Sequence, residues 1–151
     1  MKVLVFHIGP DRYGLPLAGV NRVLPVVALK QIPLAPPFVA GLMDLHGEPV
    51  PVIDLSRLAG LVPEQAWFDT RIILVDYPLT DGASASLGLL AEHVTGIEAI
   101  DAQALREPGV DSAPFLGRVA GNTKGMLQLV QLDGLLTLEV RALLFQARAA
   151  A

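Results

Sequence analysis

The sequence predicts a mainly β fold, made of small barrels or a sandwich, and three observations carry that prediction. About ten short apolar runs, many of them β-branched, follow one another along the chain. Turn-forming residues separate them, with 14 glycines and 12 prolines among 151 residues. The segment that opens at Gly47 also has a counterpart that opens at Gly125. Short strands separated by frequent turns are typical of such folds.

The first two strands are predicted at residues 3–8 and 12–17, joined by a turn at 9–11. Residues 20–24 fit either an edge strand or a helical turn, because Pro25 has no N–H to donate to a sheet ladder. The prolines that follow predict an extended, non-helical connection before residue 41; they are Pro33, Pro36 and Pro37.

The segment 41–58 is predicted to form a strand, a tight turn at His46-Gly47-Glu48, a second strand and a short helix. Asp54 stands just before Leu55-Ser56-Arg57-Leu58, where a carboxylate oxygen can accept the unpaired N–H groups of a first helical turn. We therefore expect Asp54 to be a helix N-cap, and Gly41 and Gly47 to be structural turn residues.

The second half repeats short strands and turns. The predicted strands are 71–77, 87–90, 93–100, 116–120 and 125–131, with loops at 78–86 and 101–114. Gly125 belongs to the last hairpin turn, and Asp133 is expected to open a capped turn like that at Asp54. The apolar spacing within 137–149 predicts a C-terminal helix.

An internal sequence repeat indicates that the chain has two similar halves. Gly47 and Gly125 are 78 positions apart, and Asp54 and Asp133 are 79 apart, about half the chain in each case. Hairpin, strand, capped turn and leucine recur in the same order. We expect a single domain, 1–151, with approximate subdomains at 1–68 and 69–136 that share a core and whose strands can interleave.

Composition limits the possible functions. The 52% hydrophobic content indicates a folded chain, and 17% charged residues leave apolar surface for partners. A net charge of −4 disfavours nucleic acid, because a basic surface supplies most of the affinity for it. The absence of cysteine excludes thiolate chemistry and fits a reducing compartment. No apolar run reaches the roughly 18 residues of a membrane span, and residues 1–8 fit a strand better than a signal peptide. We expect a cytoplasmic protein that is not embedded in a membrane.

The sequence contains no strong catalytic or metal-binding motif. His7, His46 and His93 lie on separate predicted elements, without the i, i+4 spacing of a metal-binding helix. No serine has the G-x-S-x-G context of a nucleophile, and the glycine-rich segment 117–125 lacks phosphate-loop spacing. We expect no enzyme, metal or cofactor. The alternative is a small hydrolase or ligand-binding barrel using Asp44, His46 and Asp54, which requires those side chains to converge.

An ordered set of residues between Val3 and Leu136 resembles the CheW-like coupling domain. The set is Phe6-His7-Ile8-Gly9, Tyr13-Gly14-Leu15-Pro16, Val20, Pro33, Pro36, Val39-Ala40-Gly41-Leu42, Gly47, Pro51-Val52-Ile53-Asp54-Leu55, Arg71-Ile72-Ile73-Leu74-Val75, Gly88-Leu89-Leu90, Val94, Ile97, Phe115-Leu116-Gly117 and Leu132-Asp133-x-Leu135-Leu136. The resemblance implies two five-stranded SH3-like β-barrels that share a core.

The resemblance also implies a non-catalytic scaffold. Such an adaptor couples the signalling tip of a methyl-accepting chemoreceptor to the regulatory domain of a chemotaxis-type histidine kinase, within receptor arrays at the inner membrane. No kinase, receiver or phosphotransfer segment accompanies the match, so we expect a stand-alone coupling protein. A paralogue that binds the kinase but not the receptor is a further possibility.

Two positions depart from the family pattern. The family turn usually reads Asn-Leu-Arg-Gly, whereas this chain has Asp44-Leu45-His46-Gly47, and a position that is commonly Glu is Arg22. By resemblance, Val20, Arg22, His46 and Gly47 belong to the receptor-binding surface. Charge changes at a rim alter partner choice, which leads to the hypothesis of a dedicated non-flagellar pathway. The competing explanation is drift at tolerant surface positions.

Overall fold

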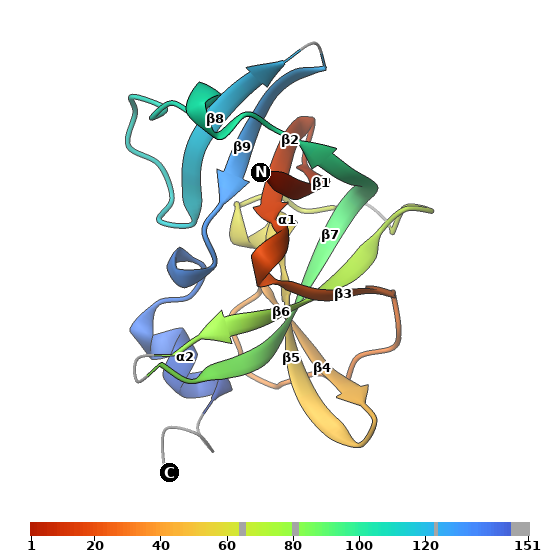
Figure 1. Ribbon diagram of the computed structural model, residues 1–151. Helices are drawn as coiled ribbons and strands as arrows, with labels where there is room; N and C mark the ends of the chain where they lie inside the picture. Colours follow the sequence, from red (N-terminus) through yellow and green to blue (C-terminus); the bar gives the residue numbers. More distant parts are fainter. Residues whose placement is uncertain (64–65, 80–81, 123, 146–151) are drawn as a thin grey trace.

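The computed structural model describes residues 1–63, 66–79, 82–122 and 124–145 (Figure 1). The strands of this part of the chain are β1 (Lys2–Ile8), β2 (Asp11–Pro16), β3 (Val20–Pro25), β4 (Val39–Leu45), β5 (Glu48–Asp54), β6 (Arg71–Pro78), β7 (Ser84–Ala99), β8 (Leu116–Asn122) and β9 (Gly125–Val130). The helices are α1 (Leu55–Leu58) and α2 (Leu138–Leu144), and the 3₁₀ turns are η1 (Leu17–Gly19), η2 (Ala102–Ala104) and η3 (Leu132–Gly134).

Strand β7 has 16 residues and belongs to two groups of five strands. Its first half pairs with β6 and β5, and together with β3 and β4 these strands form the lower barrel of Figure 1. Its second half pairs with β1, and together with β2, β8 and β9 these strands form the upper barrel. Each barrel therefore takes strands from both halves of the chain: β1 and β2 join the upper barrel, although they lie within 1–68.

The two barrels repeat one pairing scheme, as the repeat between Gly47 and Gly125 predicts. The antiparallel hairpin β1–β2 corresponds to β6–β7, and β4–β5 corresponds to β8–β9. A parallel pairing then joins each pair of hairpins, β2 with β9 in the upper barrel and β5 with β7 in the lower one. Because parallel pairing requires a long connection, strands from distant parts of the chain meet in each barrel.

Strands β1 and β6 are buried on both faces, which explains their near-continuous apolar sequences. In β1, Val3 and Val5 pack into a small cluster inside the upper barrel. In β6, Ile72 and Leu74 pack into the corresponding cluster of the lower barrel. The opposite faces meet in a shared core, which consists of Leu4, Phe6, Ile8, Leu15, Ile53, Leu55, Ile73, Val75, Tyr77, Ala85, Leu87, Leu89, Ala91, Phe115, Val130, Leu135, Leu136 and Phe145.

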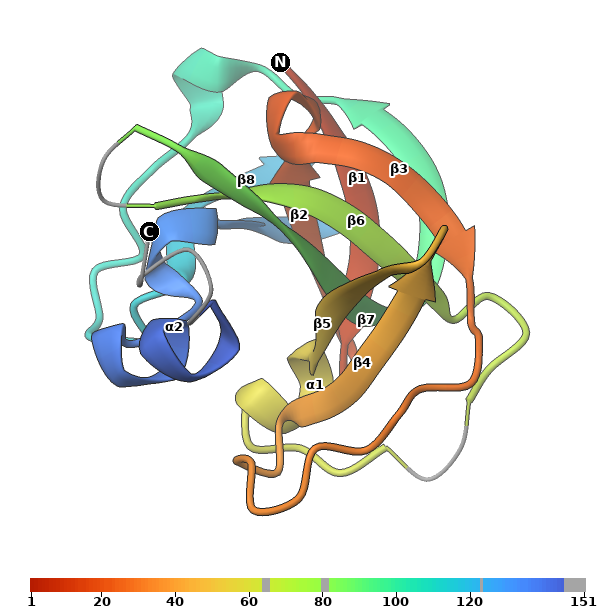
Figure 2. The ribbon, with the colours of Figure 1, turned by 90° about the horizontal axis from the view of Figure 1, so that it is seen from below.

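Helix α2 closes one side of the shared core. The Arg141 Nε donates a hydrogen bond to the Tyr77 hydroxyl at 3.0 Å, and its guanidinium lies 5.2 Å from the centre of the Tyr77 ring. Phe145 stacks on the same ring at 5.9 Å. Seen from below, β3 lies on the opposite side of the lower barrel from α1 (Figure 2).

Several predicted element boundaries change. Two strands were expected within residues 87–100, but the single strand β7 covers 87–99 because one backbone serves both barrels. The expected loop at 78–86 is shorter, since β6 continues to Pro78 and β7 starts at Ser84. The C-terminal helix ends at Leu144, where Phe145 leaves helical geometry to stack on Tyr77; residues 146–149 of that prediction lie outside the described residues.

Candidate functional site: a groove between the two barrels

An open groove of about 510 Å³ lies where the two barrels meet. Its walls come from β2 and η1, from the end of β6, and from β8, β9 and η3. The residues that line it are Leu15, Pro16, Gly19, Asp76, Pro78, Arg118, Leu129, Val130, Gln131, Leu132 and Asp133. Most of these side chains are apolar, so the groove can take the apolar face of another polypeptide segment.

Three exposed charges stand around this apolar lining. Arg118 lies on β8 of the upper barrel, and Asp76 lies on β6 of the lower barrel. Asp133 was expected to cap a turn, but it lies inside η3, whose N-cap is Gln131 and has no side-chain capping bond. The Asp133 carboxylate makes no capping bond and is the third exposed charge at the groove. The backbone oxygen of Asp133 accepts a hydrogen bond from Arg141 Nη2 at 3.0 Å.

Of the four predicted receptor-contact residues, Val20 is the one adjacent in sequence to a groove-lining residue. It follows Gly19 directly, is half-buried, and packs against the shared core. Arg22 is exposed two residues further along β3, opposite Leu74 of β6. Neither Val20 nor Arg22 is among the residues that line the groove.

His46 and Gly47 lie at the exposed tip of the β4–β5 hairpin. Both adopt left-handed backbone conformations, with φ of 53° at His46 and 88° at Gly47. The Asp44 Oδ1 accepts the Gly47 N–H at 2.7 Å and fixes the turn. The structure therefore brings Asp44 and Gly47 together, and places His46 on a protruding tip rather than in the groove.

The other turn glycines differ in how tightly they are packed. Gly41 has φ of 145°, and a Cβ at this position would lie 2.5 Å from the backbone oxygen of Lys30, which pairs with Leu42 across a β-bridge. Gly125 has φ of 107° at the β8–β9 turn, and a Cβ there would meet no atom within 4 Å. Close approach thus demands glycine at position 41, and backbone conformation favours it at position 125.

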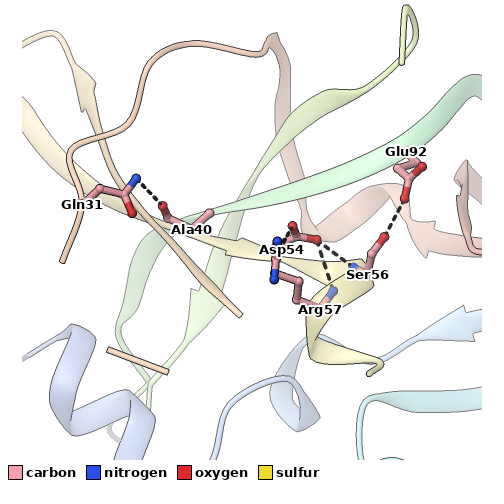
Figure 3. A network of polar contacts seen from close by, with 6 residues as sticks. All are labelled: Gln31, Ala40, Asp54, Ser56, Arg57 and Glu92. Atoms are coloured by element: carbon pink, nitrogen blue, oxygen red, sulfur yellow. Dashed lines mark hydrogen bonds and ion pairs between the residues drawn. The ribbon is translucent and has the colours of Figure 1, made fainter. Parts of the chain in front are cut away.

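Asp54 caps α1, as predicted (Figure 3). Its Oδ1 accepts the N–H groups of Ser56 at 3.0 Å and Arg57 at 3.3 Å, and the Arg57 Nε lies 3.6 Å from its Oδ2. Burial raises the pKa of the Asp54 carboxyl, while the two backbone hydrogen bonds and Arg57 oppose that rise. The carboxylate is thus committed to the helix and is withdrawn from solvent.

The catalytic alternative fails on geometry. Asp44 is opposite Pro49 near the start of β5, His46 lies in the turn that precedes β5, and Asp54 is the last residue of the strand. A seven-residue strand with a rise of about 3.3 Å per residue separates the two ends by about 20 Å. Asp44, His46 and Asp54 therefore cannot converge on one substrate.

A polar cluster that sequence inspection missed lies beside α1. Ser56 Oγ donates to Glu92 Oε1 at 2.9 Å, and Trp67 Nε1 donates to the other oxygen of Glu92. Next to it, the His93 ring lies 5.3 Å from that of His7, and its Nδ1 lies 2.8 Å from Asp69 Oδ1. Only the adjacency of Glu92 and His93 was visible in sequence. Within the described residues, no group of three or more acidic or histidine side chains is arranged to hold a metal ion.

Comparison with known families identifies the two-barrel fold. The family model for the CheW-like domain matches residues 2–140. The chain belongs to the CheW-like family. A solved CheW structure agrees with this assignment: the scaffolding protein TtCheW from Thermoanaerobacter tengcongensis is 28% identical, with a TM-score of 0.80 over 91% of this chain and 88% of that one. The expected pair of SH3-like β-barrels is thereby confirmed.

Two curated CheW relatives match shorter regions. The chemotaxis protein CheW of Treponema pallidum is 23% identical over 71% of this chain, and that of Helicobacter pylori is 28% identical over 50%. The matched regions span 62% and 46% of those two proteins, less than two thirds of either. Across the described residues of this CheW-like chain, no helix is long and apolar enough to cross a membrane.

Proposed function

We propose that this CheW-like chain is a non-catalytic adaptor that couples the signalling tip of a chemoreceptor to the regulatory domain of a histidine kinase. The observation that carries the proposal is the open, mostly apolar groove between the two barrels. An amphipathic helix from a receptor tip would lay its apolar face there, as helices do in other protein grooves. Membership of the CheW-like family supports the same function.

An adaptor also needs a second surface, for the kinase. The residues of the β4–β5 hairpin lie outside the groove lining, and so does the tip of the β8–β9 hairpin, where Gly125 and Met126 are exposed. Binding at both kinds of surface would recruit a cytoplasmic protein to receptor arrays at the inner membrane. Many weak contacts in such an array give steep responses through effective concentration.

The proposal is tested by reconstituting receptor, kinase and this protein on vesicles and measuring kinase activity with and without it. Arg118→Glu reverses one of the exposed charges at the groove, and Lys2→Glu reverses an exposed charge on β1 as the matched control. We expect coupling to fall with Arg118→Glu and to persist with Lys2→Glu. Unchanged kinase activity without the protein, together with no ternary complex, would overturn the proposal. A complex with kinase alone would instead indicate a kinase-binding paralogue.

We further propose that Arg22 and His46 tune the choice of receptor, in a dedicated non-flagellar pathway. Both side chains are exposed, and they reverse or weaken the charges usual in the family at these positions. Pull-downs against a panel of receptor tips, using Arg22→Glu and His46→Arg, separate this hypothesis from drift. Selective binding that the variants redirect supports specificity. Equal binding to every tip, before and after substitution, supports drift.

A further inference from the structure

The cluster around His93 lies where β7 passes from one barrel to the other. Glu92 is opposite His7 in the β1–β7 pairing, and this pairing shifts register between Val5 and His7. His93 has φ of 50°, a left-handed conformation that is rare inside a strand. The backbone of β7 therefore departs from regular strand geometry at His93, where the strand passes from one barrel to the other.

Three polar contacts hold the segment 66–70 to this part of β7. Trp67 Nε1 donates to Glu92, His93 Nδ1 contacts Asp69 Oδ1, and the Val94 N–H donates to the Asp69 backbone oxygen at 3.0 Å. The indole of Trp67 also lies 5.4 Å from the His93 ring. The segment 66–70 is thus attached to residues 92–94 of β7. His7, on the adjacent strand β1, makes none of these three contacts.

His7 and His93 differ in whether a carboxylate contacts the ring and can neutralise its positive charge when it is protonated. His93 faces Asp69 directly, so its positive charge would have a carboxylate at 2.8 Å. Among the described residues, His7 makes no hydrogen bond to a carboxylate, and Arg12 is opposite it on β2. The charged and titratable groups that face His7 are His93 and Glu92 on β7, Arg12 and Asp11 on β2, and Asp69.

The electrostatic surroundings of His7 disfavour its charged form. Burial lowers the pKa of His7, and His93 and Arg12 lower it further, while Asp69 and Asp11 oppose them. Glu92, the closest acidic group in register, already accepts bonds from Ser56 and Trp67. When acidification protonates both rings, they repel each other. The positive charge on His7 then has, within the described part of the chain, no carboxylate of its own to offset this repulsion.

We propose that His7, His93 and Asp69 form a proton-sensitive joint between the two barrels. On acidification, the ion pair with Asp69 keeps the charged His93 attached to the segment 66–70. The charged His93 then repels the charged His7. The contact that yields is the pairing of β1 with β7 at the register shift. The joint lies apart from the groove residues and does not depend on the proposed coupling function.

Imidazole NMR titration of the whole chain tests the coupling directly, because the chain has three histidines and His46 lies at a distant hairpin tip. Because His93 lowers the pKa of His7, we expect His93→Asn to raise the pKa of His7. Asp69→Asn should lower the pKa of His7 further, because the Asp69 carboxylate opposes that lowering. A titration of His7 that neither substitution changes would overturn the proposal.

Fluorescence and amide exchange test the structural response. Trp67 is the single tryptophan, so its emission reports the charge on His93. On acidification we expect an emission change that persists in His46→Gln and is lost in His93→Asn, which removes the imidazole beside Trp67. Asparagine suits this position because it tolerates left-handed φ. Protection factors at residues 5–8 should fall about tenfold relative to residues 72–75 of β6. Equal changes in both strands, or none, would show that no joint opens.

Discussion

The Asp54 Oδ1 accepts the backbone N–H of Ser56 at 3.0 Å, and this bond joins the end of β5 to the start of α1. Ser56 then extends the connection, because its hydroxyl donates to Glu92 at 2.9 Å (Figure 3). Asp54 is only 7% exposed, so an ionisable group has been withdrawn from water for this capping role. The cap therefore stabilises α1 at an electrostatic cost that substitution can separate from the hydrogen bonds.

We expect Asp54→Ala to lower the free energy of unfolding by about 1–2 kcal/mol, because the N–H groups of Ser56 and Arg57 lose their acceptor. Asp54→Asn keeps an oxygen in the same place and should change the free energy of unfolding by less than about 0.5 kcal/mol at neutral pH. Urea denaturation followed by circular dichroism measures both. An Asn variant as unstable as the Ala variant would contradict the capping role.

The same pair of variants has a pH signature. Because burial raises the pKa of Asp54, the folded state binds this proton more tightly than the unfolded state does. Its contribution to stability is therefore present at low pH and declines as pH rises from the ordinary aspartate range through the raised pKa. Asp54→Asn lacks that decline, so its stability relative to the natural chain should increase with pH. A constant difference across pH 3–7 would exclude this effect.

We expect Gly41→Ala to lower the free energy of unfolding by at least about 2 kcal/mol, since its Cβ would lie 2.5 Å from the Lys30 oxygen in a backbone conformation with φ of 145°. Gly47→Ala is the matched control, because a Cβ there meets nothing within 4 Å and only backbone strain remains, about 1 kcal/mol. Equal losses in denaturant titrations of the two variants would show that packing against Lys30 is unimportant.

The docking of α2 can be measured through Tyr77 and Arg141. Tyr77→Phe keeps the ring that stacks on Phe145 but removes the acceptor of the Arg141 Nε–H, so we expect a loss of about 0.5–1.5 kcal/mol. A double-mutant cycle with Arg141→Met should give a coupling energy of about 0.5–1 kcal/mol. Additive effects would mean that the hydrogen bond contributes nothing to holding α2.

His7 predicts how stability responds to acid. Since its pKa is lowered in the folded state, chiefly by burial, the unfolded chain binds this proton more readily. The free energy of unfolding should fall as pH drops below about 6.5, the ordinary histidine pKa, and continue to fall down to the lowered value. His7→Gln should flatten this dependence between pH 7 and 5, whereas His46→Gln, at the exposed tip, should not. A profile unchanged by His7→Gln would contradict this assignment.

Local features of the fold could be predicted because they depend on neighbouring residues. The cap at Asp54 and the turn at Gly47 follow from side chains and backbone within three positions of each other. The repeat between Gly47 and Gly125 was visible for the same reason, since each hairpin has its own pattern. Asp133 resembled Asp54 in position, but η3 begins after Gln131, so the same residue type has no cap to make.

Long-range features could not be read from local pattern. Ser56 and Trp67 reach Glu92 across 36 and 25 positions, and no periodicity announces such a contact. The continuity of β7 was also hidden, because Glu92-His93 interrupts the apolar run where the strand departs from regular geometry. The residues that line the groove come from both barrels, for example Arg118 from the upper one and Asp76 from the lower one. The groove therefore exists only once the two barrels have packed together.

The sharing of β7 limits how this protein can be taken apart or recombined. Neither barrel is a portable module, because excising one removes a strand from the other and exposes its edge to aggregation. A break within 61–68 would leave one fragment with β1 to β5 and another with β6 to β9, and each would lack partners for its own strands. Such fragments are expected to be unfolded when separate and to regain the native structure when mixed. The shared strand therefore makes the two barrels one cooperative folding unit.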